Sequence, residues 1–521
     1  MRRPVGHAHG SVRTLHDQVA TRIVMSSSPD EAHRVDLESL PPLYHDRAFW
    51  GMSITQFLGA FNDSVFKQVV LLLCLSVVVV EGQVPSDKQF LAQAVFAIPF
   101  ILFSGFAGYC SDRVTKRYLI IGCKIAEIFV MLAAVFTFWI SPSPEVGTFV
   151  RHIGSTTLES EVYIVNGMPW LLLLVLCLMG TQSAWFGPAK YGILPEMVRG
   201  SDLPRFNGII QMTTFLALIL GIWIGGWLID QFHDSLSTAA LGCVAIAIVG
   251  TATSLLVRKT PVAQREGRLR SSDFAAGAET WRFLKSDRSL RTALLVYSAF
   301  WFVAAILPMT INWLGVYQFR KNYETTSLLL ASSSVGIAVG FVVAGRMSKQ
   351  RIRFSLVRIG SWGLIACLIL ISIPRGLPDA PPDGAGTDDA AMSDSDDDQK
   401  GMQEIDGKKV ITERLSASTW PHLLGYGGSQ CILILMGFFT GLFALPVQVF
   451  LQSKPPSHLK GRVIGSMNLI NWIAIILAAV FFFACDAALA NLGLPKYFVF
   501  GLASLVLLPI AIFYRPADVE L

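Results

Sequence analysis

Polar side chains that could do chemistry lie within the mostly apolar run at residues 50–80, among them Gln56, Asn62, Asp63 and Lys67. On a helix, positions 56, 63 and 67 share one face because they are spaced by seven and by four residues. An ionisable group inside a membrane costs at least about 2.5 kcal/mol, so it normally faces a partner or a polar cavity. Asp63 and Lys67 could neutralise each other and serve packing alone. We favour the other interpretation, in which these residues line a polar passage and contact a charged ligand.

A second charged pair, Lys124 and Glu127, interrupts the apolar run at 118–140 with a spacing of three residues. This spacing also places both side chains on one helix face. A buried pair that fixes helix packing and a pair with a functional role are equally compatible with the pattern.

The elements that must hold these residues are long apolar runs, which recur along the whole chain of 521 residues. Hydrophobic residues make up 53% of the chain and charged residues only 15%, whereas about a quarter of a soluble domain is charged. The runs are continuous and reach the roughly 20 residues of a spanning helix, which favours helices over barrel strands. The sequence therefore predicts an all-α membrane protein with twelve transmembrane helices. They are expected at 50–80, 89–110, 118–140, 168–187, 206–230, 236–257, 290–317, 326–346, 354–374, 427–451, 462–486 and 496–514.

Lysine and arginine are unevenly divided between the loops. One set of loops, at 113–117, 199–205, 346–353 and 454–462, is rich in them, and the alternate set carries few. Because basic loops remain on the cytoplasmic side, both termini are expected in the cytoplasm.

Polar segments divide the chain further. The segment 375–426 is acidic, rich in Pro, Gly and Ser, and nearly free of aromatics, so it is expected to be a disordered periplasmic loop that buries no core. The expected units are a disordered cytoplasmic tail at 1–48, a six-helix bundle at 49–258, a basic cytoplasmic linker at 259–288, a second six-helix bundle at 289–515, and a cytoplasmic tail at 516–521.

No pattern in the sequence indicates covalent chemistry. The eight cysteines lie in apolar segments without a metal-type CxxC pair, and none of the nine histidines precedes an Asp by five positions. A Gly-x4-Gly-Lys-Ser/Thr nucleotide loop is absent, and the Asp run at 394–398 lacks the Gly and Glu of a calcium loop. We expect neither an enzyme nor a cofactor, a metal site or a nucleic-acid partner.

The segment GYCSDRVTKR at 108–117 resembles the loop signature of the major facilitator superfamily, Gly-x-x-x-Asp-Arg-x-x-Arg/Lys-Arg, in the place where that family carries it. The resemblance implies two pseudo-symmetric six-helix bundles. It also implies that Asp112, Arg113, Lys116 and Arg117 form a charged gate at one face. Simple loop solvation is the alternative for these charges. The equivalent loop of the second half has Lys349 at the Asp position, so a second gate would be degenerate.

Three further segments resemble the bacterial lysophospholipid transporter family: QFLGAFND at 56–63, FGPAKYGILPE at 186–196 and GFFTGLFALPVQ at 437–448. The resemblance implies an inner-membrane carrier that flips lysophospholipids such as lysophosphatidylethanolamine for reacylation, by alternating access between the halves. We expect a monomer, and a separate acyltransferase is a candidate partner. Asp63 and Lys190 would contact the charges of the substrate, although Lys190 could also be a basic anchor at a helix end.

Two features qualify this interpretation. Pro188 and Pro195 predict a break at the end of the fourth helix, which suits a moving element. The family carries a basic residue in the outer half of helix seven, whereas here 302–309 reads FVAAILPM and Asn312 is the nearest polar residue. The sequence therefore does not identify the residues that would bind the headgroup.

Two rival functions remain compatible with the sequence. A proton-coupled exporter of amphipathic drugs would use Asp63 as its proton site. A membrane scaffold without transport activity would dock a separate acyltransferase through the basic segment 258–291.

Overall fold

The computed structural model describes residues 40–75, 77–79, 87–141, 145–153, 156–166, 170–199, 202–260, 278–348, 351–376, 402–405, 408–412, 421–455 and 460–520. Most of the predicted tail at 1–48, linker at 259–288 and acidic loop at 375–426 lies outside the described residues, as do Lys349 and residue 521.

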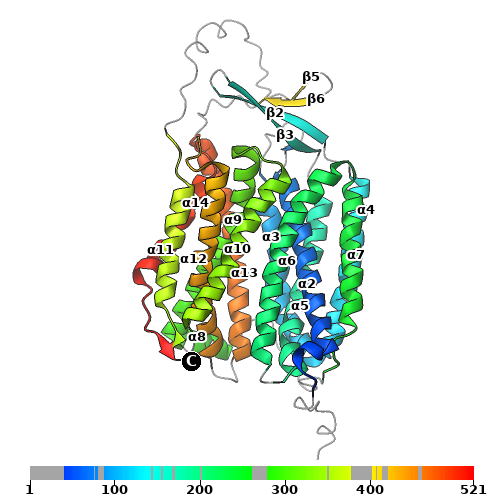
Figure 1. The fold of residues 1–521 in the computed structure, drawn as a ribbon, viewed down its shortest axis with the longest axis vertical. Helices are drawn as coiled ribbons and strands as arrows, with labels where there is room; N and C mark the ends of the chain where they lie inside the picture. The colour runs from blue at the N-terminus through cyan, green and yellow to red at the C-terminus, as the bar shows by residue number, and fades with distance from the viewer. Residues whose placement is uncertain are drawn as a thin grey trace, which may run out of the picture.

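The apolar runs form long helices that stand side by side (Figure 1). Within the described residues, nine helical segments are long and apolar enough to cross a membrane, and one of them, Arg205–Ser254, contains two helices. Two shorter apolar helices complete the set, which confirms the prediction of twelve. The twelve are α2 (Arg47–Leu75), α3 (Gln89–Arg113), α4 (Lys116–Ile140), α5 (Trp170–Met197), α6 (Leu203–Phe232), α7 (Leu236–Ser254), α9 (Arg288–Trp313), α10 (Tyr323–Ser348), α11 (Ser355–Ile371), α12 (Gly425–Ser453), α13 (Lys460–Asn491) and α14 (Phe498–Phe513).

The helices form two bundles of six, α2–α7 and α9–α14. In the first bundle α2 packs on α6 and α7, α3 on α5, and α4 on α7; in the second, α12 packs on α10 and α11, and α14 on α11. The bundles meet where α6 packs on α10 and α3 on α13. Glycine permits close approach between helices: a Cβ at Gly340 of α10 would lie 2.2 Å from the carbonyl oxygen of Phe438 of α12.

Strands from three loops form a five-stranded sheet at one end of the bundles (Figure 1). Its order is β1-β3-β2-β6-β5. The long strands β2 and β3 run antiparallel, and β6 lies parallel to β2 with Thr148 opposite Val410. We call this end of the molecule the sheet end, and the opposite end, with the loop at 113–117, the basic end. The strands are β1 (Val77–Val79), β2 (Glu145–Ile153), β3 (Thr156–Asn166), β5 (Met402–Ile405) and β6 (Lys408–Thr412).

Smaller elements complete the described chain. Five residues after α9 form a π-helical turn, and Arg351–Ile352 pairs with Val519–Glu520 near the C-terminus. These elements are η3 (Leu43–His45), η4 (His233–Ser235), α8 (Ala278–Ser286), η6 (Leu314–Gln318), β4 (Arg351–Ile352) and β7 (Val519–Glu520).

The sheet corrects the prediction of a wholly disordered segment at 375–426, because β5 and β6 lie within that segment. The prediction averaged the composition over about fifty residues. That average is dominated by Asp, Pro and Gly, and it conceals the run KKVIT at 408–412, whose β-branched residues favour a strand. The first helix likewise ends at Leu75 rather than at residue 80. Valine is β-branched and favours strands, and the valines at 77–79 form β1.

The predicted break at Pro188 and Pro195 was wrong, because α5 continues through both prolines to Met197. A proline removes one backbone donor, but neighbouring helices support the chain inside a bundle, and prolines are tolerated in transmembrane helices. Prolines lie within α3, α9, α12 and α14 as well.

Candidate functional site

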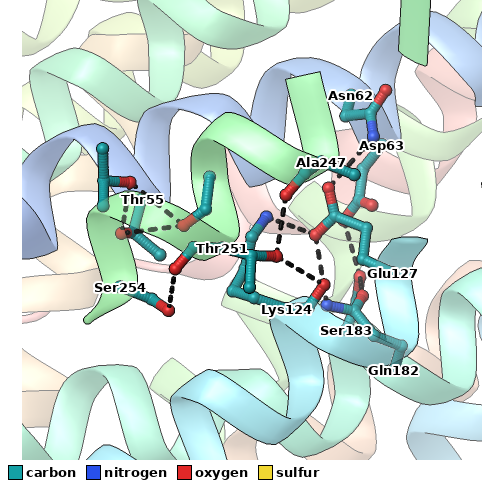
Figure 2. A network of polar contacts seen from close by, with 12 residues as sticks. Thr55, Asn62, Asp63, Lys124, Glu127, Gln182, Ser183, Ala247, Thr251 and Ser254 are labelled. Carbon is teal, nitrogen blue, oxygen red and sulfur yellow. Dashed lines mark hydrogen bonds and ion pairs between the residues drawn. The ribbon is translucent and has the colours of Figure 1, made fainter. Parts of the chain in front are cut away.

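A buried ion pair, Lys124 with Glu127, forms the centre of a polar network between α2, α4, α5 and α7 (Figure 2). Both side chains are only 1% exposed. The amide nitrogen of Asn62 donates to Glu127 Oε1 at 3.0 Å and also to the carbonyl oxygen of Cys243 at 3.3 Å. Gln182 Nε2 lies 3.4 Å from Glu127 Oε2. Glu127 thereby connects α4 with α2 and α5, and Thr251 of α7 donates to the carbonyl oxygen of Lys124 at 3.0 Å. The sequence pattern alone did not decide whether this pair serves packing or function.

Asp63 joins this network through α5. The hydroxyl of Ser183 lies 2.6 Å from Asp63 Oδ2 and 3.0 Å from Gln182 Oε1. The other carboxylate oxygen, Oδ1, is buried and has no hydrogen-bond partner among the described residues. The proposed neutralisation of Asp63 by Lys67 is not observed, because within the described chain no ion pair shorter than 4.0 Å joins them.

Lys67 instead lines a cavity of about 240 Å³ between the two bundles. Its Nζ lies 4.8 Å from the centre of the Phe96 ring. Among the described residues that line the cavity, Lys67 is the only ionisable one, and Ser333, Ser334 and Thr440 add hydroxyl groups. The remaining walls are mostly apolar and come from both bundles, with Leu71, Leu218, Ile222, Phe300, Val303, Ala304, Leu307, Pro308, Leu330, Ile337, Leu364 and Leu507 among them.

Polar contacts across the bundle boundary close the sheet end beside this cavity. Gln68 Nε2 donates to Asn312 Oδ1 at 3.1 Å and to Ser327 Oγ at 3.0 Å. Asn312 in turn donates to Gln89 Oε1 at 2.9 Å, and Gln89 donates to the carbonyl oxygen of Met309 at 3.1 Å. Asn312, which the sequence singled out in helix seven, thus holds the two bundles together.

Further contacts at the same end strengthen the closure. The carboxylate of Asp230 on α6 accepts the backbone N–H of Glu324 at 2.7 Å, at the start of α10. A Cβ at Gly226 would lie 2.3 Å from the carbonyl oxygen of Tyr323, so only glycine permits this approach. Burial raises the pKa of Asp87, which lies 3.8 Å from Lys496 Nζ of the other bundle.

Lys190 and Gln56 lie together in the first bundle. Lys190 Nζ is 3.5 Å from Gln56 Oε1 and 4.5 Å from the centre of the Tyr191 ring. Gln56 Nε2 also donates to Thr214 and to the carbonyl oxygen of Ile210 on α6. Among the described residues around the cavity, neither side chain is part of the wall, so these two predicted contacts lie apart from Lys67.

The predicted gate lies at the basic end, where Lys116 Nζ pairs with Glu196 Oε1 at 2.6 Å. This ion pair joins the loop signature at 108–117 to the segment at 186–196, the two motifs that carry the family resemblances. Arg117 donates to the carbonyl oxygen of Leu255 at 2.8 Å, and the Arg113 guanidinium lies 4.4 Å from the Tyr109 ring centre. The side chain of Asp112 lies outside the described residues, and the gate remains a prediction.

Replacing Gly192 by valine should break the Lys116–Glu196 pair, because a Cβ at Gly192 would lie 2.9 Å from Lys116 Cε. Overpacking of this kind costs about 1–3 kcal/mol, which thermal unfolding of the purified protein would detect. The matched control is Gly187→Val on the same helix, where a Cβ meets nothing within 4 Å. Equal stability of the two variants would contradict this packing.

Sequence reasoning missed the partners that complete the site. Gln182 and Ser183 connect Asp63 to Glu127, and Ser333, Ser334 and Thr440 line the cavity. A signal was present, since TQS at 181–183 and SSS at 332–334 interrupt apolar runs. Hydroxyl groups in transmembrane helices also bond to their own backbone, as Ser333 does to Leu330, so the signal is ambiguous without contacts.

Two six-helix bundles around a central cavity define the architecture of a secondary transporter. A family model described as Major Facilitator Superfamily matches residues 49–382. The chain belongs to the major facilitator superfamily and is a multi-pass bacterial inner-membrane transporter.

Curated relatives and a solved structure resemble the chain over most of its length. It is 26% identical to the lysophospholipid transporter LplT of Cronobacter sakazakii over 439 residues, which cover 83% of this chain and 87% of the relative. It is 23% identical to LplT of Photorhabdus laumondii over 437 residues, covering 83% and 86%. The fold resembles that of the nucleoside transporter NupG, with a TM-score of 0.57, 11% identity, and coverage of 89% of this chain and 99% of that one.

Proposed function

We propose that this protein carries lysophospholipids, such as lysophosphatidylethanolamine, across the inner membrane from the outer to the inner leaflet. The observation that carries the proposal is the cavity between the bundles, whose only ionisable wall residue within the described chain is Lys67. The names of the LplT relatives support the same substrate class.

The chemistry of the cavity fits a lysophospholipid headgroup. An ammonium group binds a phosphate through charge-assisted hydrogen bonds, and the hydroxyls of Ser333, Ser334 and Thr440 provide further donors. The volume of about 240 Å³ is below the roughly 300–1,000 Å³ of drug-sized ligand sites, so it suits a headgroup rather than a whole lipid. The acyl chain would extend from the headgroup along the apolar wall.

The orientation supports a transport cycle. We place the basic end in the cytoplasm, because basic loops remain inside, and both termini then lie there as well. The sheet end faces the periplasm, and the contacts of Gln68, Asn312 and Gln89 shut the cavity off from that side in this state. Alternating access requires these contacts to break when the protein binds substrate from the outer leaflet.

The proposal is tested with spheroplasts of a strain that lacks the protein, fed labelled lysophosphatidylethanolamine. We expect formation of labelled diacyl lipid to require the wild-type gene. The strain must lack other lysophospholipid carriers, and a parallel feed of labelled fatty acid controls for acylation itself. Equal conversion of the lysophospholipid with and without the protein would refute the assignment.

A further inference from the structure

Four side chains form a continuous chain of polar contacts from α2 through α5 to α4 (Figure 2). Asp63 Oδ2 lies 2.6 Å from Ser183 Oγ, which lies 3.0 Å from Gln182 Oε1. The amide nitrogen of Gln182 then lies 3.4 Å from Glu127 Oε2. Every oxygen–oxygen contact in such a chain needs a proton between the two oxygen atoms.

If the carboxylates of Asp63 and Glu127 are both ionised, this series of contacts has one proton fewer than it needs. Ser183 has a single hydroxyl proton, but its oxygen contacts two acceptors, a carboxylate oxygen of Asp63 and the amide oxygen of Gln182. One contact would then be an oxygen–oxygen repulsion. A proton on Asp63 Oδ2 resolves this, because Asp63 then donates to Ser183 while Ser183 donates to Gln182.

The opposite orientation of the Gln182 amide does not remove the requirement. If nitrogen and oxygen are exchanged, the amide nitrogen donates to Ser183, but the amide oxygen then faces Glu127 Oε2. That contact needs a proton on Glu127. Glu127 already has the ammonium of Lys124 and the amide of Asn62 as donors, so an added proton is least favourable there. The additional proton therefore belongs on Asp63.

The surroundings of Asp63 support a neutral carboxyl group. Its second oxygen, Oδ1, is buried with no partner among the described residues, and a buried charge without hydrogen bonds is costly. The groups that act on it electrostatically are Lys67 on α2, Lys124 and Glu127 on α4, and Lys190 on α5. From α7, the carbonyl oxygen of Cys243 accepts from Asn62, which also donates to Glu127. None of these cations lies within 4.0 Å of Asp63 in the described chain.

We propose that Asp63, Ser183, Gln182 and Glu127 form a proton-binding site that holds one proton on Asp63. Loss of the proton would leave Ser183 with one donor for two acceptors, so the contact between α2 and α5 depends on protonation. This site goes beyond the headgroup cavity at Lys67 and does not depend on which substrate the protein carries. It assigns to Asp63 a role other than the substrate contact that the family resemblance implies.

Infrared spectroscopy of the full-length protein in detergent at neutral pH tests the site directly, because a protonated carboxyl group has a carbonyl stretching band that a carboxylate lacks. We expect this band in the wild-type protein and its loss in Asp63→Asn. In Ser183→Ala, the band should move to higher frequency, because the protonated carboxyl loses its acceptor. The matched control is Asp46→Asn, which removes a carboxylate paired with Arg258 and should leave the band unchanged.

The outcome of this experiment is independent of transport, so it separates the proton site from the proposed function. A wild-type protein without the band, or a band that survives Asp63→Asn unchanged, would overturn the proposal. If Asp63→Asn does not fold, the Ser183→Ala variant decides alone, because an unshifted band there is incompatible with a carboxyl group that donates to Ser183.

Discussion

Lysophosphatidylethanolamine uptake should fall by about ten- to a hundredfold when Lys67 is replaced by methionine. Methionine keeps most of the volume of the lysine side chain but removes the only ionisable group that lines the cavity in the described chain. A hydrogen bond to a charged group contributes about 1.5–3 kcal/mol, and each 1.4 kcal/mol corresponds to a factor of ten. The measurement is initial uptake of labelled lysophosphatidylethanolamine by spheroplasts, normalised to the amount of protein in the membrane.

Two matched variants make this result specific. Lys67→Arg keeps the positive charge and should retain part of the uptake, although the planar guanidinium differs in shape from an ammonium. Lys285→Met removes an exposed lysine on α8, outside the cavity, and should have no effect. Normal uptake by Lys67→Met would exclude the headgroup position that we assign to this cavity.

Replacing Glu127 by glutamine should destabilise the protein by about 3–5 kcal/mol. The change conserves shape but leaves the ammonium of Lys124 without its anion, and both side chains are only 1% exposed. Breaking a buried pair by removing one partner costs this much, because an uncompensated charge stays buried. Thermal unfolding of the purified protein in detergent would show the loss as a lower unfolding temperature and a lower folded yield.

The double variant Lys124→Met with Glu127→Gln removes both charges and should recover most of the lost stability. The matched surface control is Asp287→Asn. Asp287 pairs with Lys454 at 2.9 Å, but the two side chains are 22% and 33% exposed, so this change should cost less than about 1 kcal/mol. If the double variant were as unstable as Glu127→Gln alone, the buried charge could not be the cause.

The fold was largely predictable because its main signal is hydrophobicity. Runs of about 20 apolar residues specify spanning helices, and all twelve were found. Helix ends were less predictable, since packing against neighbours carries α5 through Pro188 and Pro195. The short strands β1, β5 and β6 were missed because they contain at most five residues each and pair with segments distant in the chain. The longer strands β2 and β3 were missed because they lie in a loop between two apolar runs, and the search for runs of spanning length left that loop unassigned.

The site was predictable only in part. Periodicity identified Asp63 and Lys67 as unusual, but it could not show that the two separate, with Asp63 facing α5 and Lys67 facing the second bundle. Apart from that of Ser64 on α2, the hydroxyl groups that line the cavity come from α10 and α12, and no local pattern connects those helices to α2. A local sequence pattern shows which residues share a helix face, whereas the partner of that face depends on the packing of both bundles.

The sheet has a mechanical consequence for the transport cycle. Strands β1, β2 and β3 belong to loops of the first bundle, and β5 and β6 belong to a loop of the second. The seam between them is the β2–β6 ladder, which pairs Thr148, Phe149 and Val150 with Val410, Ile411 and Thr412. A rotation that separates the bundles at this end must either break these three residue pairs or move one loop together with the other bundle. We therefore expect the length of the β2–β6 ladder to limit how far the two bundles can separate at the sheet end.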